Sequence, residues 1–149
     1  MINSLSFVTR FGWVNIEEID EKLISVKFGK KIDIGRSAFL HKAKKQIIEF
    51  VNGKLKVFDL DIFLSFLILQ KKIWRELQKI PYGKKKSYGE IAKKFKTSPR
   101  YIGNVCGKNN HLLIIPCHRV VRSDGKLGGF SGLGGIKLKI KLLSLEKNV

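Results

Sequence analysis

The sequence contains only two cysteines, Cys106 and Cys117, and only three histidines among its 149 residues. No Cys-x-x-Cys pair occurs, which argues against both a zinc site of the usual spacing and a disulfide framework. There is no apolar run of about 18 residues and no signal peptide, which argues against a membrane-spanning or secreted protein. We therefore expect a cytoplasmic protein with two free thiols and no bound metal.

Acidic residues are also scarce, with 12 Asp and Glu against 30 Lys and Arg and a formal net charge of +18. The excess is uneven, because residues 1–69 carry a net charge of +3 and residues 70–149 a net charge of +15. A strongly positive half favours the phosphate backbone of nucleic acid as partner. A lysine-rich genome or adaptation to heat could also produce the high total, but neither explains the asymmetry.

The first half, residues 1–69, has the pattern of a small supporting domain. Apolar and polar residues alternate in three short segments, which predicts three strands. These segments are residues 6–8, 12–16 and 23–28. Apolar residues at helical spacing then predict a helix over 37–50, ended by Gly53. Residues 57–69 are largely apolar, and their pattern does not decide between helix and strand.

The second half, residues 70–149, is predicted to be mostly helical. An apolar stripe over 73–80 indicates a helix that stops at the turn residues 81–83. A final helix is expected to begin at Gly135, after a glycine-rich loop. Its core-facing residues are predicted to be Ile136, Ile140, Leu142 and Leu143.

Two short helices between these elements predict a helix-turn-helix. Ser87 and Glu90 have the spacing of a capping box, which starts the first helix. Ser98 and Pro99 have the types preferred at the start of a second helix, which ends near Gly107. The whole chain therefore predicts an α/β (α+β) fold, with a sheet-plus-helix domain followed by a helical domain with a helix-turn-helix.

Cys117 is the strongest candidate for chemistry. Pro116 lacks an amide hydrogen and interrupts strand pairing, so the chain can turn and present the thiol. His118 and Arg119 place positive charge beside it, which favours the nucleophilic thiolate. A buried cysteine is more often a small apolar core residue, so this segment alone does not decide.

The hexapeptide Ile-Pro-Cys-His-Arg-Val at 115–120 resembles the signature of the O6-alkylguanine-DNA alkyltransferases, also called methylated-DNA–protein-cysteine methyltransferases. Further motifs stand in the order and at the spacing of that family. They are Ile-Pro-Tyr-Gly at 80–83, Ser-Tyr-Gly-Glu-Ile-Ala at 87–92, Arg-Tyr-Ile-Gly at 100–103, Asn109, Gly134-Gly135, Leu142-Leu143 and Glu146. The resemblance is strong over 70–147 and extends to 1–69 only in general shape.

The resemblance implies a role for each matched residue of the catalytic set. Cys117 is the alkyl acceptor, His118 deprotonates it through a water, and Glu146 orients and charge-balances His118. Asn109 braces the turn that carries the thiol. Tyr88 crowds the DNA backbone so that the damaged nucleotide rotates out, and it protonates the departing guanine.

The resemblance also implies contacts with DNA and with the base. Arg100 fills the gap that the extruded base leaves in the stack. The DNA-binding set is Arg100, Tyr88, Gly89 and Ser123, and the substrate-binding set is Val120, Phe130 and Ser131. The implied function is repair of O6-alkylguanine in double-stranded DNA by irreversible, single-turnover transfer of the alkyl group to Cys117. The implied protein is a monomer that needs no cofactor, no metal and no membrane.

The sequence departs from the family pattern in several places. The link between Tyr88 and Arg100 is shorter than in many members, and the glycine-rich loop before Glu146 is longer, so the assignment of Glu146 depends on the alignment of that loop. Phe130 stands where many members have tyrosine. Cys106 stands where larger apolar side chains are frequent, which predicts a roomier pocket.

Two other function classes fit parts of the sequence. A binding module that only flags damaged DNA fits the helix-turn-helix, but its known examples lack the cysteine that stands at position 117. A thiol hydrolase would use Cys117 and His118 as its catalytic pair. However, the catalytic Cys and His of such enzymes are usually far apart in the chain, and a hydrolase does not explain the net charge of +15 on residues 70–149. Considered alone, Tyr88 is also consistent with an aromatic residue of the core, and Arg100 with a solvent-exposed charge on a helix.

Overall fold

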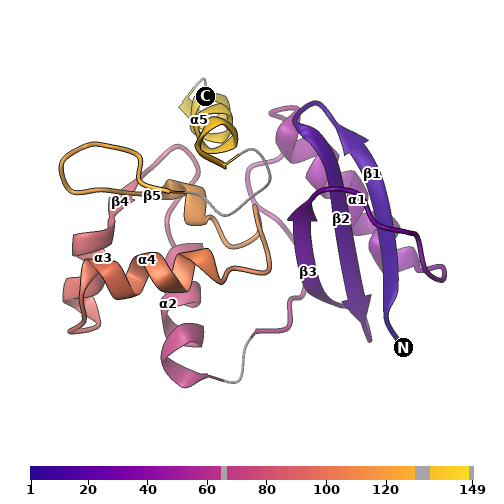
Figure 1. The fold of residues 1–149 in the computed structure, drawn as a ribbon. Helices are drawn as coiled ribbons and strands as arrows, with labels where there is room; N and C mark the ends of the chain where they lie inside the picture. The colour runs from indigo at the N-terminus through magenta and orange to yellow at the C-terminus, as the bar shows by residue number, and fades with distance from the viewer. Residues whose placement is uncertain (65–66, 130–134, 148–149) are drawn as a thin grey trace. The chain divides into compact units, whose positions relative to one another are not determined.

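The computed structural model describes residues 1–64, 67–129 and 135–147, which fall into two compact units (Figure 1). The first unit comprises Met1–Leu64 with Asn110–Ile114, and the second comprises Ser65–Asn109 with Ile115–Val149. Among the described residues, no helix combines the length and the apolar character needed to cross a bilayer.

The first unit is an antiparallel three-stranded sheet with one helix. Its elements are β1 (Asn3–Thr9), β2 (Gly12–Ile19), β3 (Lys22–Phe28) and α1 (Ala38–Val51), and the strands lie in the order β1-β2-β3. All three predicted strands are confirmed, and each is longer than the alternation indicated. The predicted helix is confirmed as well, because the Ser37 hydroxyl accepts the Leu40 amide and caps α1.

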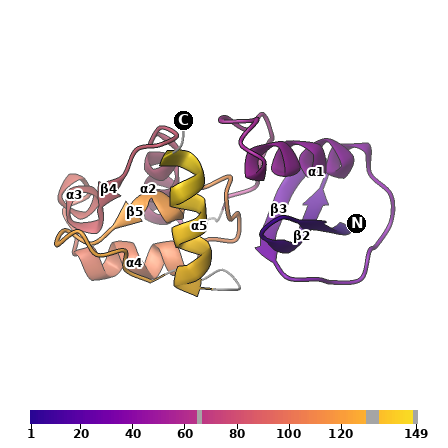
Figure 2. The same ribbon diagram turned by 90° about the horizontal axis from the view of Figure 1, so that it is seen from above.

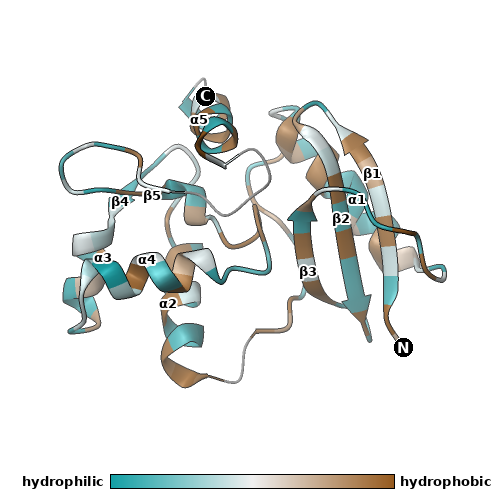
Figure 3. Cartoon of the chain, viewed as in Figure 1, coloured by the Kyte–Doolittle hydropathy of each residue, from teal (hydrophilic) through white to brown (hydrophobic). Residues whose placement is uncertain are grey.

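The core of the first unit lies between the sheet and α1. Val14 and Ile16 of β2 are fully buried, and so are Ala43, Ile47 and Phe50 of α1. Figure 3 shows hydrophobic stretches on the strands and on α1. Alternation in the strands and a helical period in α1 thus place the apolar residues of both on facing surfaces.

Two segments pair with β3. Residues around Ile62 pair with Leu23, so residues 57–64 of the undecided segment form neither a helix nor a regular strand, and α2 begins at Ile68. Val26 donates its amide to Asn110 O at 2.7 Å and accepts the Leu112 amide at 3.1 Å. Backbone pairing therefore assigns the segment directly after Asn109 to the first unit.

The second unit is mostly helical, and its helices are seen from above in Figure 2. Its elements are α2 (Ile68–Gln78), β4 (Lys86–Ser87), α3 (Tyr88–Lys94), α4 (Pro99–Gly107), a 3-10 turn (Cys117–Arg119), β5 (Val120–Val121) and α5 (Gly135–Lys147). Strands β4 and β5 pair in parallel. The predicted α/β (α+β) fold is therefore confirmed.

The helix-turn-helix consists of α3 and α4. Ser87 and Glu90 form the predicted reciprocal capping box, and the Ser98 hydroxyl accepts the Tyr101 amide at the start of α4. The Trp74 indole of α2 donates to Val105 O at 3.4 Å and packs α2 against α4. Local caps thus set where the two helices begin, and the Trp74 hydrogen bond ties α2 to α4.

The predicted inner face of α5 is wrong at Ile136 and Ile140, right at Leu142, and only half-buried at Leu143. Ile136 and Ile140 were expected in the core, but each is 48% exposed. Leu142 is buried as expected, together with Leu138, Lys139 and Glu146. Helical periodicity misassigned the face because two of the buried positions are charged, and both find hydrogen-bond partners inside the unit.

Candidate active site

Cys117 lies at the start of a short 3-10 turn, not in a strand. Its amide donates to Ile115 O at 2.8 Å, and the Arg119 amide donates to Pro116 O at 2.9 Å, which closes the turn. The Cys117 side chain is 3% exposed. The residues directly before Pro116 already form turns and a bend, and the 3-10 turn that follows holds the thiol inside the second unit.

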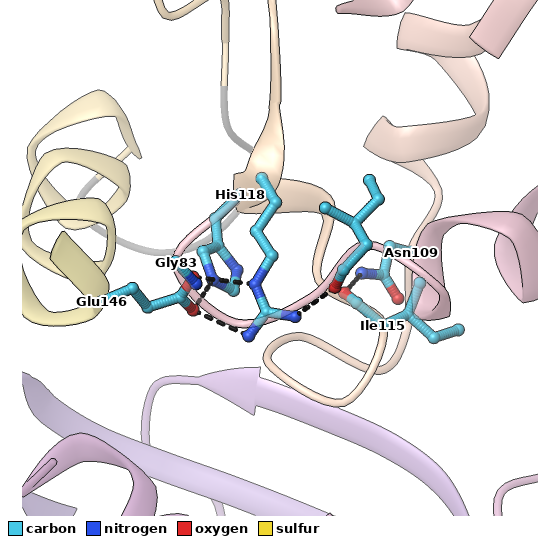
Figure 4. Close-up of polar contacts among 7 residues, drawn as sticks. Gly83, Asn109, Ile115, His118 and Glu146 are labelled. Atoms are coloured by element: carbon cyan, nitrogen blue, oxygen red, sulfur yellow. Dashed lines mark hydrogen bonds and ion pairs between the residues drawn. The ribbon is translucent and has the colours of Figure 1, made fainter. Parts of the chain in front are cut away.

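Asn109 braces this turn through its side-chain amide (Figure 4). Its Nδ2 atom donates to Ile115 O at 2.9 Å and to Cys117 Sγ at 3.2 Å. Asn109 follows α4, where its backbone amide donates to Cys106 O at 3.1 Å. One side chain thus ties the end of the second helix of the helix-turn-helix to the thiol.

His118 and Glu146 form a buried pair with Arg119. The distance between His118 Nε2 and Glu146 Oε2 is 2.6 Å (Figure 4). Arg119 donates from Nε to Glu146 Oε1 at 2.8 Å and from Nη2 to Oε2 at 2.9 Å, a bidentate pair. The Gly83 amide donates to the same carboxylate at 3.2 Å. Glu146, near the end of α5, therefore lies against His118.

Burial and the hydrogen bonds among His118, Arg119 and Glu146 set the protonation states of His118 and Glu146. Burial alone would raise the pKa of Glu146, but hydrogen bonds from His118 and Arg119 lower it to about 2. Burial, together with the nearby Arg119 and Lys139 charges, lowers the pKa of His118 against the raising effect of Glu146. Because an ionised carboxylate only accepts, the neutral imidazole carries its proton on Nε2. This leaves Nδ1 as the basic nitrogen of His118.

The thiol is not held as a thiolate, contrary to the expectation from its charged neighbours. Burial raises the pKa of Cys117 to about 11, against the lowering effects of the Asn109 hydrogen bond and the Lys139 charge. The Arg119 guanidinium binds Glu146 and Ile80 O instead. His118 and Arg119, although adjacent in sequence, therefore do not favour the thiolate of Cys117, because both side chains bind the Glu146 carboxylate.

Lys139 is a site residue that the sequence did not reveal. Its side chain is fully buried, and its ammonium donates to Val120 O at 2.7 Å, to Gly129 O at 3.3 Å and to Leu127 O. It also donates to the Tyr88 phenol oxygen at 3.4 Å. The only available signal was its place on α5, on the same helical face as Leu142 and Glu146.

A pocket of about 780 Å³ opens above the thiol. Tyr88, Arg100 and Cys117, which the sequence predicted as site residues, all line this pocket. Its lining consists of Tyr88, Pro99, Arg100, Gly103, Cys106, Gly107, Cys117, Arg122 and Gly129. Burial, with smaller effects from Cys106 and Cys117, raises the pKa of the Tyr88 phenol to about 12, so the phenol stays protonated at neutral pH. The pocket is large enough for a nucleobase and has a thiol, a phenol and a guanidinium on its walls.

The remaining residues predicted to contact DNA or the base are Gly89, Ser123, Val120, Phe130 and Ser131. Gly89 lies against Ser123, because a Cβ atom at position 89 would stand 2.9 Å from Ser123 Oγ. Val120, expected to contact the substrate base, is fully buried, and its carbonyl accepts a hydrogen bond from the Lys139 ammonium. Phe130 and Ser131 lie outside the described residues. Within the described ranges, no group of three or more His, Cys, Asp or Glu side chains could hold a metal ion.

Fold and site together define an α+β protein with a buried thiol beside a helix-turn-helix. The family model described as 6-O-methylguanine DNA methyltransferase, DNA binding domain, matches residues 68–148. The chain therefore belongs to the 6-O-methylguanine DNA methyltransferase family, and the resemblance seen in its motifs is confirmed.

Individual relatives agree with the family assignment. The chain is 35% identical to a methylated-DNA–protein-cysteine methyltransferase of Metallosphaera sedula, over 98% of this chain and 94% of the relative. It is 45% identical to one of Sulfolobus acidocaldarius, over 65% of this chain and 61% of the relative. The crystal structure of Mycobacterium tuberculosis O6-methylguanine methyltransferase matches with a TM-score of 0.87 at 30% identity, covering 99% of this chain and 94% of that one. A structure of the M. tuberculosis protein in complex with DNA matches with a TM-score of 0.85 at 31% identity, over 97% and 92%.

Proposed function

We propose that this protein repairs DNA by moving an alkyl group from the O6 atom of guanine in duplex DNA to the Cys117 thiol. The observation that carries the proposal is the pocket that joins the Cys117 thiol to Tyr88 and Arg100 of the helix-turn-helix. Relatives named methylated-DNA–protein-cysteine methyltransferases and a DNA complex of the M. tuberculosis protein support it. The net charge of +15 on residues 70–149 suits a phosphate backbone.

Because the Cys117 thiol is buried, the damaged base must leave the duplex before it can react. The thiol is 3% exposed at the floor of its pocket, so an alkyl group inside a stacked duplex cannot reach it. Extrusion of a base costs a few kcal/mol of stacking and pairing. Arg100 begins the pocket face of α4 and is exposed, so its guanidinium can enter the stack and offset part of that cost.

The transfer itself is a displacement at saturated carbon. The sulfur of Cys117 forms a bond to the alkyl carbon while the bond from that carbon to O6 breaks. The thiol proton leaves through a water to Nδ1 of His118, and the resulting imidazolium is stabilised by Glu146 at 2.6 Å. A thiol pKa of about 11 leaves roughly one thiol in ten thousand ionised at pH 7, so this proton transfer is required.

The departing guanine takes a proton from Tyr88. A phenol whose pKa is raised to about 12 is protonated before the reaction and can act as general acid. The Lys139 ammonium, 3.4 Å from the phenol oxygen, stabilises the phenolate that forms. The product thioether is chemically inert, so we infer that each molecule acts once.

Mass spectrometry tests this proposal directly. A duplex oligonucleotide with one O6-methylguanine should add a single methyl group to the protein, and the modified peptide should contain Cys117. The Cys117→Ser variant should acquire no methyl group. In the matched variant Cys106→Ser the methyl group should still be found on Cys117. Repeated turnover, or methyl removal by Cys117→Ser, would refute the proposal.

A further inference from the structure

A second arginine lines the pocket at its rim. The described lining of the 780 Å³ pocket contains Arg100 from α4 and Arg122 from the loop after β5. The Arg122 side chain is 57% exposed, whereas Cys117 is 3% exposed. Arg122 therefore stands at the opening of the pocket and Cys117 at its floor. Arg100 is expected in the base stack, which leaves Arg122 without a role in the proposed transfer.

A tight turn fixes the backbone of Arg122. Its amide donates to Lys126 O at 2.8 Å, and its carbonyl accepts the Gly125 amide at 3.1 Å. In Figures 1 and 2 the loop that carries this turn extends from β5 beside α3. The turn thus presents Arg122 from the side of the pocket that α3 forms, while Arg100 comes from α4.

The stem of Arg122 lies next to Tyr88. A Cβ atom built at Gly128 would stand 3.0 Å from Tyr88 Cε2 and 3.5 Å from Arg122 Cγ. One built at Gly89, the residue after Tyr88, would stand 2.9 Å from Ser123 Oγ. The start of α3 and the turn after β5 therefore lie against each other, and Arg122 shares the pocket opening with Tyr88.

Asp124 holds the guanidinium of Arg122. Arg122 Nη2 and Asp124 Oδ2 are 2.9 Å apart. The other carboxylate oxygen, Oδ1, accepts the Lys126 amide at 3.0 Å and so anchors Asp124 in the turn. Because the two side chains of the pair are 57% and 44% exposed, the pair contributes little stability, and Arg122 can exchange its partner at small cost.

The place of Arg122 suits a DNA phosphate. When a base rotates about its backbone into a pocket, its sugar and phosphates stay joined to the duplex and remain at the opening. The guanidinium fork binds two phosphate oxygens in the same way as two carboxylate oxygens. A phosphate beside the extruded nucleotide can therefore replace Asp124 as the partner of Arg122.

We propose that Arg122 binds a phosphate directly flanking the extruded alkylguanine, and that Asp124 occupies the guanidinium in the absence of DNA. This inference rests on the proposed transfer to Cys117, because it requires a nucleotide in the pocket. It makes Arg122 a DNA-binding residue that holds the damaged nucleotide out of the stack, and Asp124 a competitor of the phosphate. Neither residue makes or breaks a bond.

Neutralisation of single phosphates tests the contact. The probes are duplexes with one O6-methylguanine, in which one phosphate at a time is replaced by an uncharged methylphosphonate. Binding is measured with the Cys117→Ser protein, so that no transfer occurs. Arg122→Gln should weaken binding to the all-phosphate duplex about tenfold, since a charged hydrogen bond is lost. It should also lower the slope of log affinity against log salt by about one.

The position of the neutral phosphate decides the assignment. The penalty of Arg122→Gln should vanish when the flanking phosphate that Arg122 binds is the neutral one. Arg75→Gln removes the same charge from an exposed position of α2, and its penalty should not depend on either flanking phosphate. Arg122→Lys keeps the charge without the fork, so it should restore the salt slope and only part of the affinity.

Asp124→Asn tests the competition. The asparagine keeps an oxygen for the Lys126 amide but no longer pairs with a cation, so it should tighten binding severalfold when Arg122 is present. In the Arg122→Gln protein the same substitution should have no such effect. Equal tightening with and without Arg122 would reflect net charge alone and would overturn the role of Asp124.

The outcomes separate this inference from the proposed function. A penalty of Arg122→Gln that persists when either flanking phosphate is neutral would overturn the phosphate contact. Disappearance of the penalty at a phosphate farther from the lesion would overturn its placement beside the extruded nucleotide. If the parent protein itself transferred no methyl group to Cys117, the proposed function would fail, whatever Arg122 binds.

Discussion

The imidazole of His118 and the carboxylate of Glu146 meet at 2.6 Å, although 28 residues separate them in the chain. Both side chains are buried, with exposed fractions of 0% and 1%. The carboxylate also receives the Arg119 guanidinium and the Gly83 amide. It therefore joins the thiol-bearing turn, the turn after α2 and the end of α5, and it fixes the tautomer of His118.

Glu146→Gln should destabilise the protein and slow alkyl transfer. Loss of the carboxylate leaves the buried Arg119 without its counter-charge, a change that costs on the order of 3 kcal/mol in free energy of unfolding. It also removes the charge that stabilises protonated His118. Urea denaturation and single-turnover transfer measure the two effects. Glu21→Gln, at an exposed position, is the control, and equal behaviour of the two variants would contradict the assigned role of Glu146.

Acid should destabilise the protein in two stages. Burial lowers the pKa of His111 and of His118 below 6.5, so the unfolded chain binds more protons and stability falls as pH drops through 6.5. The pKa of Glu146 is about 2 in the folded state against the ordinary value of 4.5 in the unfolded chain, so its contribution is lost from about pH 4.5 downward. Denaturant unfolding between pH 7 and 3 measures this. His111→Gln should flatten the first stage, whereas the exposed His41→Gln should not.

Asn109→Ala should make the Cys117 thiol harder to ionise. The Asn109 side chain donates to the sulfur at 3.2 Å and lowers the pKa of the thiol, so its removal raises that pKa further above 11. The rate of alkylation by iodoacetamide at a fixed pH below the pKa should fall severalfold. Peptide mapping assigns the rate to Cys117. The exposed Asn104→Ala provides the comparison, and a faster reaction in Asn109→Ala would count against the hydrogen bond.

Lys139→Met should weaken both the loop after β5 and the general acid. The substitution deprives Val120 O and Leu127 O of their donor, at about 1–3 kcal/mol for the buried Val120 acceptor and less for the part-buried Leu127 acceptor. It also removes the cation beside the Tyr88 phenol, so the transfer rate should fall. Thermal unfolding and transfer kinetics show the two effects. Lys141→Met lies at an exposed position of the same helix and should change neither.

Arg100→Ala should slow transfer from duplex DNA more than transfer from a single strand. A single strand needs no replacement for the extruded base, whereas a duplex loses a few kcal/mol of stacking. The ratio of duplex to single-strand rates should therefore drop by about tenfold or more. The exposed Lys108→Ala should lower both rates alike. Equal losses in Arg100→Ala would make Arg100 an ordinary backbone contact.

Much of the fold followed from local patterns. The strands of the first unit, α1 with its Ser37 cap, and the capped helices of the helix-turn-helix were all predictable, because alternation, helical period and capping depend on neighbours in the chain. The motif spacing around Cys117 also led to the family. The inner face of α5 was mispredicted, since a periodicity argument treats charged residues as outward-facing.

The sequence by itself determined the positive charge of residues 70–149, and it predicted a turn at Pro116 and Cys117 as the candidate acceptor. Only the tertiary structure decided which charges act on that thiol. Arg119 is two residues from Cys117 yet binds Glu146, while Lys139 is 22 residues away and lowers the thiol pKa. A side chain's electrostatic effect depends on distance through space and on burial, and neither quantity can be read from separation along the chain.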